Sequence, residues 1–233
     1  MKSWKKVTPF VILTLVTQGG YLAEAKPKPQ VDGTATYSVI HAIPAGFGAD
    51  VVDIYANNSL IIDNATPGAV KSFKVAKGNV KVKIYANGVT PSDTATPLLA
   101  TDDIYLGSGT DFSFVAHLTA EEKAKLSFFK NMVTDAGKKR SWLTFRHVAA
   151  APAVQFRVNG DRTFIPISNS MERKKSYITK MYSVSATLID STTVLVGPVP
   201  LTLQGDTNTV LYLWGAKSKG NLTFLKQEGP TKR

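Results

Sequence analysis

Two short runs of basic residues are the side chains in this sequence best suited to bind a charged ligand. One run is Lys138, Lys139 and Arg140, and the other is Arg173, Lys174 and Lys175. Clustered positive side chains attract anions, and salt screens such contacts over a Debye length of about 8 Å at physiological ionic strength. Runs of charge also occur on solvated surfaces that bind nothing, so both interpretations stand. We predict that these six residues form a site for a polyanion or a protein partner.

The histidines offer a second kind of chemistry, because imidazole can bind metals or transfer protons. His41 and His147 lie at matching places in two similar segments, 38–44 and 144–150. A zinc site needs three or four ligands, whereas the whole chain has three histidines and no cysteine. We therefore predict no metal site. Each of these two histidines is expected to be half-buried in a strand and hydrogen-bonded to a neighbouring loop.

The aspartates and glycines form none of the familiar catalytic or ion-binding motifs. Six aspartates fall in two stretches, Asp50, Asp53 and Asp63, then Asp102, Asp103 and Asp111, without an Asp-x-Asp-x-Asp-Gly calcium loop. The chain also lacks a Gly-x-Ser-x-Gly turn and a phosphate-binding glycine loop. We therefore expect no catalytic residues, no cofactor and no enzymatic activity.

The first residues have the composition of an export signal. Three lysines within residues 1–6 precede an apolar run at 7–16, and Ala23-Glu24-Ala25 offers small residues at a cleavage site. A membrane-spanning helix needs about 20 apolar residues, so we predict a cleaved signal peptide at 1–25 and no transmembrane segment after cleavage. A flexible leader is expected at 26–35. The protein is then exported, to the periplasm or, alternatively, to the cell surface or the medium.

The elements that must position the basic runs and the histidines are β-strands, and they occur in two copies. Each copy has a His-containing apolar segment, a turn with small residues and proline, an alternating segment and a turn with asparagine, at 38–57 and 144–160. A repeated supersecondary unit indicates a duplicated domain. We predict an all-β chain of two tandem immunoglobulin-like β-sandwiches, at 36–118 and 142–233.

Residues 119–141 are predicted to join the two sandwiches as a short helix and a basic linker. Thr119 and Glu122 fit a capping box. Leu126 and Phe129 follow three residues apart, as on one face of a helix that ends near Asn131.

Charge is divided unevenly along the chain. Residues 36–118 hold five lysines and seven aspartates, whereas 142–233 hold twelve basic and five acidic residues. The segment between them adds six basic and three acidic residues. The second half therefore favours an anionic partner. For an exported chain we expect an anionic polysaccharide or an envelope protein, and no nucleic acid.

Two groups of residues resemble known families. His41, Pro44, the strand 52–55 and Asn57 resemble the opening of a secreted bacterial domain of unknown function, family 4397, and residues 152–154, Asn159 and Gly160 match it again. Gln155 replaces the aspartate of that pattern in the second copy. Segments 184–190 and 197–213 are similar to the end of the alginate biosynthesis protein F family, exported accessories of exopolysaccharide O-acetylation.

Both resemblances imply a non-catalytic exported accessory or binding protein without a cofactor. The second implies that it assists alginate-like exopolysaccharide O-acetylation in the periplasm by binding the polymer or a partner enzyme. The alternative is a secreted surface, adhesion or structural module with an unidentified ligand.

Overall fold

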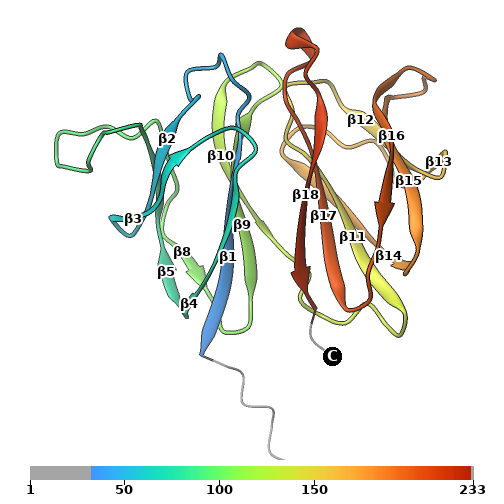
Figure 1. The fold of residues 1–233 in the computed structure, drawn as a ribbon, viewed down its shortest axis with the longest axis horizontal. Coiled ribbons are helices and arrows are strands. Elements are labelled where there is room, and N and C mark those ends of the chain that lie inside the picture. The colour runs from blue at the N-terminus through green and yellow to red at the C-terminus, as the bar shows by residue number, and fades with distance from the viewer. Residues whose placement is uncertain (1–32, 232–233) are drawn as a thin grey trace, which may run out of the picture. The chain divides into compact units, whose positions relative to one another are not determined.

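The computed structural model describes residues 33–231, so the predicted signal peptide and most of the leader lie outside the described residues. The described chain is all-β, with strands β1 to β18 and one 3-10 turn, η1 (Figure 1). No helix in this part of the chain is long and apolar enough to cross a membrane.

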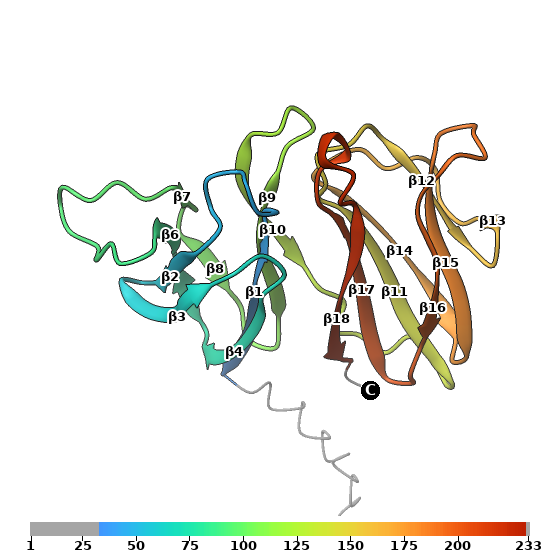
Figure 2. The same ribbon diagram turned by 45° about the horizontal axis from the view of Figure 1, so that its top comes forward.

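Strands β1 to β10 form two four-stranded sheets and one short pair. Their bounds are β1 Thr34–Ala42, β2 Val52–Ala56, β3 Ser59–Ala65, β4 Val70–Ala76, β5 Gly78–Val80, β6 Val82–Ala86, β7 Leu99–Ala100, β8 Ile104–Leu106, β9 Asp111–Leu118 and β10 Ala124–Lys130. The sheet orders are β10-β9-β1-β4 and β3-β2-β6-β7, and β5 pairs with β8. The loop between β6 and β7 extends away from the sheets (Figure 2).

Strands β11 to β18 repeat the two four-stranded sheets, and the described residues show no counterpart of the β5–β8 pair there. Their bounds are β11 Arg140–His147, β12 Val154–Val158, β13 Asp161–Arg162, β14 Met171–Ile178, β15 Met181–Leu188, β16 Val194–Thr202, β17 Thr207–Trp214 and β18 Thr223–Pro230, with η1 at Lys217–Lys219. The sheet orders are β14-β11-β17-β18 and β13-β12-β15-β16.

The two halves share one topology, as the sequence repeat predicts. In each half the first strand pairs in parallel with the strand before the last: β1 with β9, and β11 with β17. The other pairings of the four-stranded sheets are antiparallel. We call strands β1–β10 the first sandwich and β11–β18 the second. The immunoglobulin-like assignment and the domain boundaries stay predictions.

Three apolar layers hold the sheets together. One cluster fills the first sandwich, with Val39 and Phe114 packed against Val52 and Ile84. A second fills the other sandwich around Phe145 and Phe156, whose rings stack with centroids 4.3 Å apart. Burial of this kind of surface contributes about 25 cal/mol per Å² of apolar area.

A third cluster lies between the sandwiches. Ile40, Val115 and Phe129 of the sheet β10-β9-β1-β4 pack with Val210 and Tyr212 of the sheet β14-β11-β17-β18. Successive side chains of a strand point to opposite faces. Strands β1, β9, β11 and β17 are therefore covered on both faces, which explains why they are buried almost throughout.

The predicted helix at 119–131 is wrong, because residues 124–130 form strand β10. This strand pairs antiparallel with β9 over its whole length. Leu126 packs on the core of the first sandwich, whereas Phe129 packs on the layer between the sandwiches. Positions three apart lie on opposite faces of a strand, so a strand with one apolar contact on each face has the same spacing as one face of a helix. Thr119 and Glu122 form the β9–β10 turn instead of a cap: Glu122 N donates to Thr119 O, and Thr119 N to Lys123 O.

Candidate functional site

The two predicted basic runs lie along one edge of the second sandwich. β14 is an outer strand of its sheet and carries Arg173, Lys174 and Lys175. Lys138 and Lys139 precede β11, the neighbour of β14, and Arg140 begins it. Pairing of β11 with β14 thus places both runs along one edge, with Arg140 opposite Ile178, three residues beyond Lys175. Charged side chains on an edge strand also keep other chains from pairing with its free backbone groups.

The side chain of Arg140 is hydrogen-bonded to β14 and is not free to bind a ligand from solvent. Its Nε donates to Ser176 Oγ at 2.6 Å, and its NH2 group donates to Ser176 O at 2.7 Å. Nearby, Thr179 N donates to Lys139 O at 3.0 Å. The turn before β11 is therefore bound to the last residues of β14, and Arg140 supplies much of that attachment.

Lys138 and Lys139 border a surface hollow of about 490 Å³. Its other lining residues include Asp135, Thr179 and Asp206. Two carboxylates thus lie near the two ammonium groups, and the local charge of the hollow is balanced. The hollow itself is a less favourable place for an anion than the strand beside it.

The run on β14 is divided between the two faces of the sheet. Arg173 and Lys175 lie opposite Phe145 and Leu143, on the side of the second sandwich's own core. Lys174 lies opposite Thr144, on the side of the first sandwich. At an edge, long side chains from both faces reach solvent around the strand. These charges line the edge of the sheet together with the two lysines before β11. We call this set the ridge: Lys138, Lys139, Arg173, Lys174 and Lys175.

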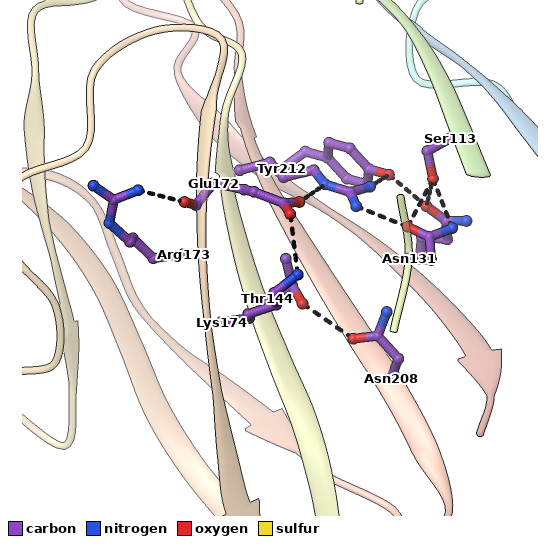
Figure 3. A network of polar contacts seen from close by, with 10 residues as sticks. Ser113, Asn131, Thr144, Glu172, Arg173, Lys174, Asn208 and Tyr212 are labelled. Carbon is purple, nitrogen blue, oxygen red and sulfur yellow. Dashed lines mark hydrogen bonds and ion pairs between the residues drawn. The ribbon is translucent and has the colours of Figure 1, made fainter. Parts of the chain in front are cut away.

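Glu172 connects this ridge to a buried arginine (Figure 3). Its Oε1 lies 3.6 Å from Lys174 Nζ, and its Oε2 accepts from Arg146 Nε at 2.9 Å. The backbone carbonyl of Glu172 accepts from Arg173 NH1 at 2.9 Å. Among the ridge residues of the described chain, Arg173 and Lys175 have no carboxylate partner within ion-pair distance.

Arg146 is the centre of a polar network that the sequence analysis missed. Its side chain is 0% exposed. NH1 donates to Tyr212 Oη and NH2 to Asn131 Oδ1, both at 2.7 Å, and the guanidinium carbon lies 4.6 Å from the Phe129 ring centroid. A buried charge is tolerated when it is paired and fully hydrogen-bonded. Here those partners come from both sandwiches.

The network continues along the layer between the sandwiches. Tyr212 Oη donates to Gln227 Oε1, which also accepts from Ser113 Oγ at 3.0 Å. Gln227 Nε2 donates to Ser38 Oγ at 2.9 Å. Burial raises the pKa of Tyr212, and the nearby Arg146 opposes that rise. The sequence does show polar residues within otherwise apolar strands. The same pattern is expected of a strand with one face in water, so it did not indicate a buried network.

The predicted loop hydrogen bonds of the two histidines are confirmed. His41 Nε2 lies 2.7 Å from Ala49 O, and His147 Nε2 lies 2.8 Å from Pro152 O. The histidines are fully buried and not half-buried, because their strands, β1 and β11, are covered on both faces. Burial lowers the pKa of each imidazole. Residues 33–231 contain no group of three or more His, Asp or Glu side chains placed to hold a metal ion.

Comparison with known proteins gives a family and distant structural likenesses. A family model described as Domain of unknown function (DUF4397) matches residues 35–157, which covers the first sandwich and the first two strands of the second. No curated protein matches the chain.

Solved structures that match are distant. The Bacillus anthracis TIE protein is 12% identical, with 77% of this chain and 33% of that chain covered and a TM-score of 0.24. This chain thus spans about a third of that protein. CBMbc (family CBM26) from Eubacterium rectale Amy13K, in complex with maltoheptaose, is 10% identical over 86% of this chain and 98% of that chain, with a TM-score of 0.25. A putative cell adhesion protein from Bacteroides ovatus is 11% identical over 86% and 97%, with a TM-score of 0.24.

Proposed function

We propose, on the premise that this chain belongs to the DUF4397 family of domains of unknown function, that it is an exported, non-catalytic module that binds an anionic polymer along β14. The observation that carries the proposal is the ridge of Lys138, Lys139, Arg173, Lys174 and Lys175 on one sheet edge. The family match ends at residue 157, so Arg173, Lys174 and Lys175 on β14 lie beyond it, whereas Lys138 and Lys139 lie within it.

The arrangement of the ridge suits a linear polymer better than a small anion. Residues in a strand rise by about 3.3 Å each, so the run on β14 and the turn beside its far end extend charge along one line. Arg173 and Lys175 have no acidic partner in the described chain to compete with a ligand. An acidic polysaccharide presents repeated carboxylates along such a line. Arginine binds carboxylates through paired hydrogen bonds, and lysine adds point charge.

This proposal includes the finer predictions from sequence. The two sandwiches are immunoglobulin-like, and the protein acts in the periplasm, where an alginate-like polymer or its O-acetylating enzyme is the partner. The likeness to the alginate biosynthesis protein F family rests on segments between residues 184 and 213 and on the overall plan of signal peptide, sandwich, basic linker and sandwich. A surface or adhesion module is the alternative, and it needs the same ridge only if its ligand is anionic.

The test measures binding of the mature chain to alginate and to a neutral dextran at low and high salt. The test variant replaces Lys138, Lys139, Arg173, Lys174 and Lys175 by glutamine. Arg140 stays, because its replacement would release the turn from Ser176. The control variant replaces five lysines of the first sandwich, Lys71, Lys74, Lys77, Lys81 and Lys83, and so removes the same charge elsewhere.

Alginate binding that weakens at least tenfold as salt rises, and that the ridge variant alone loses, would support the proposal. An equal loss of alginate binding in both variants would show that binding depends on the net charge of the protein and not on the ridge. Binding of dextran as tight as that of alginate would overturn the polyanion assignment. The isolated halves are not suitable reagents, because each would expose the polar and apolar layer that they share.

A further inference from the structure

The outer face of the sheet β3-β2-β6-β7 has a hollow that the basic edge does not explain. Ile54 and Ile84 of β2 and β6 belong to the core of the first sandwich. Successive side chains of a strand point to opposite faces, so the paired residues Tyr55 and Lys83 lie on the outer face. Together with the turn after β2 and residues 90–93 of the β6–β7 loop (Figure 2), they line a surface hollow of about 280 Å³.

A buried carboxylate holds the base of this loop in place. Asp53 is 4% exposed, its Oδ2 accepts from Gly88 N at 2.8 Å, and its Oδ1 accepts from Asn64 N at 2.9 Å. Further along the loop, Ala95 N donates to both Ser92 O and Ser92 Oγ. The loop thus has a fixed start and a hydrogen-bonded turn, and the hollow beside it is formed without a ligand.

Three polar groups of the lining have no hydrogen-bond partner within residues 33–231: the hydroxyls of Tyr55 and Thr90 and the carboxylate of Asp93. Thr90 and Asp93 are exposed. Tyr55 is only 8% exposed, but its Oη is not among the fully buried atoms that lack a partner, so solvent reaches this hydroxyl. Lys83 Nζ donates to Asn58 Oδ1 at 3.1 Å and retains further hydrogens for a ligand. A ligand in the hollow can therefore reach unused donors and acceptors.

The second sandwich retains the frame of this site but not its polar groups. Asn57 and Asn159 make the same bond in the two copies, since each accepts a backbone N–H through Oδ1. The loop between the corresponding strands is shorter there, at 189–193 against 87–98. The fold itself therefore does not need the side chains that line the hollow. In the second copy their places are taken by other residues: Arg157 for Tyr55, Gly160 for Asn58 and Ser185 for Lys83.

The chemistry of the lining narrows the class of ligand. Lys83 and Asp93 have opposite charges, so neither an anion nor a cation gains a net attraction. An apolar ligand is disfavoured, because it would cover hydroxyl and amide groups without replacing their bonds to water. A sugar matches this lining, since each of its hydroxyl groups can both donate and accept. The volume is near the lower limit of about 300 Å³ for ligand pockets, which suits a single sugar unit.

We propose that this hollow binds one unit of a neutral saccharide, whose hydroxyl groups bond to Tyr55 Oη, Thr90 Oγ1 and the carboxylate of Asp93. The hollow belongs to the first sandwich and the ridge to the second, and they share no residue. The proposal therefore does not depend on the site for an anionic polymer. Binding of dextran through the hollow would be insensitive to salt and to the ridge variant, and so could be told apart from binding at the ridge.

The probes are the methyl glycosides of glucose, galactose, mannose and N-acetylglucosamine. Glucuronic acid, glucosamine and the zwitterion glycine are the charged controls. Binding to the mature chain is followed through the backbone amide signals in 1H–15N NMR. We expect at least one glycoside to saturate a single site and to shift the amides of Asn58, Lys83 and the loop 90–93, whereas Gly160 and Ser185 should not shift. A rise in salt should change this affinity by less than about twofold, because the ligand is uncharged.

Two test variants remove the proposed contacts and leave the fold intact. Tyr55→Phe removes only the hydroxyl, so the edge-on contact of this ring with Tyr85 remains. The double variant Thr90→Val with Asp93→Ala removes two groups that have no partner in the described chain. Each variant should weaken glycoside binding by about fivefold or more. The control variant, Thr96→Val with Asp103→Ala, makes the same two changes at exposed positions outside the lining and should leave the affinity unchanged.

Four outcomes would overturn the proposal: no saturable binding of any of the four glycosides, full binding by both test variants, an equal loss in the control variant, or tighter binding of a charged control than of every glycoside. Alginate binding should be unchanged in all three variants, since none of them alters the ridge. Loss of alginate binding in the ridge variant alone, with glycoside binding retained, would confirm that the two sites are separate.

Discussion

Arg146 and Tyr212 are register partners on β11 and β17, and NH1 of Arg146 donates to Tyr212 Oη at 2.7 Å with neither side chain exposed. From this pair, contacts reach Asn131 and Phe129 of the first sandwich and Gln227 of the second. The pair therefore belongs to the layer where the two sandwiches meet, and that layer contains charge as well as apolar surface.

We expect Arg146→Met to destabilise the whole described fold. Met fills part of the volume but removes the arginine N–H donors from Glu172 Oε2, Asn131 Oδ1 and Tyr212 Oη. Removing one partner of a fully buried ion pair costs about 3–5 kcal/mol, and the cost here should be smaller, because Glu172 is 22% exposed and keeps its contact with Lys174. Urea unfolding should show this as a lower midpoint. Lys174→Met is the control, because Lys174 contacts the same carboxylate at 3.6 Å from an exposed position and should cost less than about 1 kcal/mol. Similar midpoints for the two variants would contradict a structural role for Arg146.

We expect His147→Gln to lower stability more than His41→Gln. Replacement of His147 removes two hydrogen bonds, to Pro152 O and from Ala149 N, whereas that of His41 removes one, to Ala49 O. Each net hydrogen bond contributes about 1 kcal/mol, with a larger cost where a buried partner is left unpaired. Thermal unfolding of both variants measures the difference. Alginate binding should survive in each folded variant, and its loss at wild-type stability would show that a histidine acts in the site.

Stability should fall as the pH decreases from 7 to 5. Burial lowers the pKa of all three histidines, and that of His117 to about 4. Unfolded histidine has a pKa of about 6.5, so the unfolded chain binds protons in this range that the folded chain excludes. The stability is therefore present above the unfolded pKa and is lost as pH falls towards the folded one. His117 alone accounts for about 3 kcal/mol over the full interval, as an order of magnitude.

Groups near His117 modify this pH dependence. Lys125 and His147 are the charged or titratable neighbours that further disfavour its protonation. At the other end of β9, Asp111 contributes to the pH dependence with the opposite sign, since burial raises its pKa and its folded form gains protons more readily. Urea midpoints measured across that window should flatten in His117→Gln, and an unchanged slope would assign the pH dependence to other groups.

The duplication and the strand content could be predicted because they depend on local patterns. Alternating side chains and turn residues are properties of a few neighbouring residues, and the segments around His41 and His147 repeat them. The apolar neighbours of both histidines predicted half-burial and a hydrogen bond to a loop, and only the hydrogen bond was right, because both side chains are fully buried. The parallel pairing of β1 with β9 depends on residues far apart in sequence and had no local signal.

The layer between the sandwiches is what the sequence could not predict. Ser38, Ser113 and Arg146 occupy strand positions whose neighbours along the chain point into a core, and such polar positions usually face water. Only the packing of two sheets on their outer faces makes them internal. The same packing hid the strand character of β10. The basic runs were found by composition, but their common edge depends on the pairing of β11 with β14.

The turn after β17 provides a sharp test of the second sandwich's packing. Gly215 has a φ of +100°, and a Cβ atom there would lie 2.6 Å from Asn221 O and 3.0 Å from Asn221 Oδ1. That Oδ1 accepts from Ala216 N at 2.8 Å, so Asn221 cannot move without loss of a hydrogen bond. Gly215→Ala therefore combines backbone strain with a steric clash and should cost more than about 2 kcal/mol. Gly220→Ala is the matched control, because Gly220 has a φ of +62° and nothing within 4 Å of its Cβ position. Its cost should stay near the 1 kcal/mol that is typical, roughly, of a left-handed alanine. Thermal unfolding measures the stability of both variants. A larger loss in Gly220→Ala than in Gly215→Ala would contradict the close packing of Gly215 against Asn221.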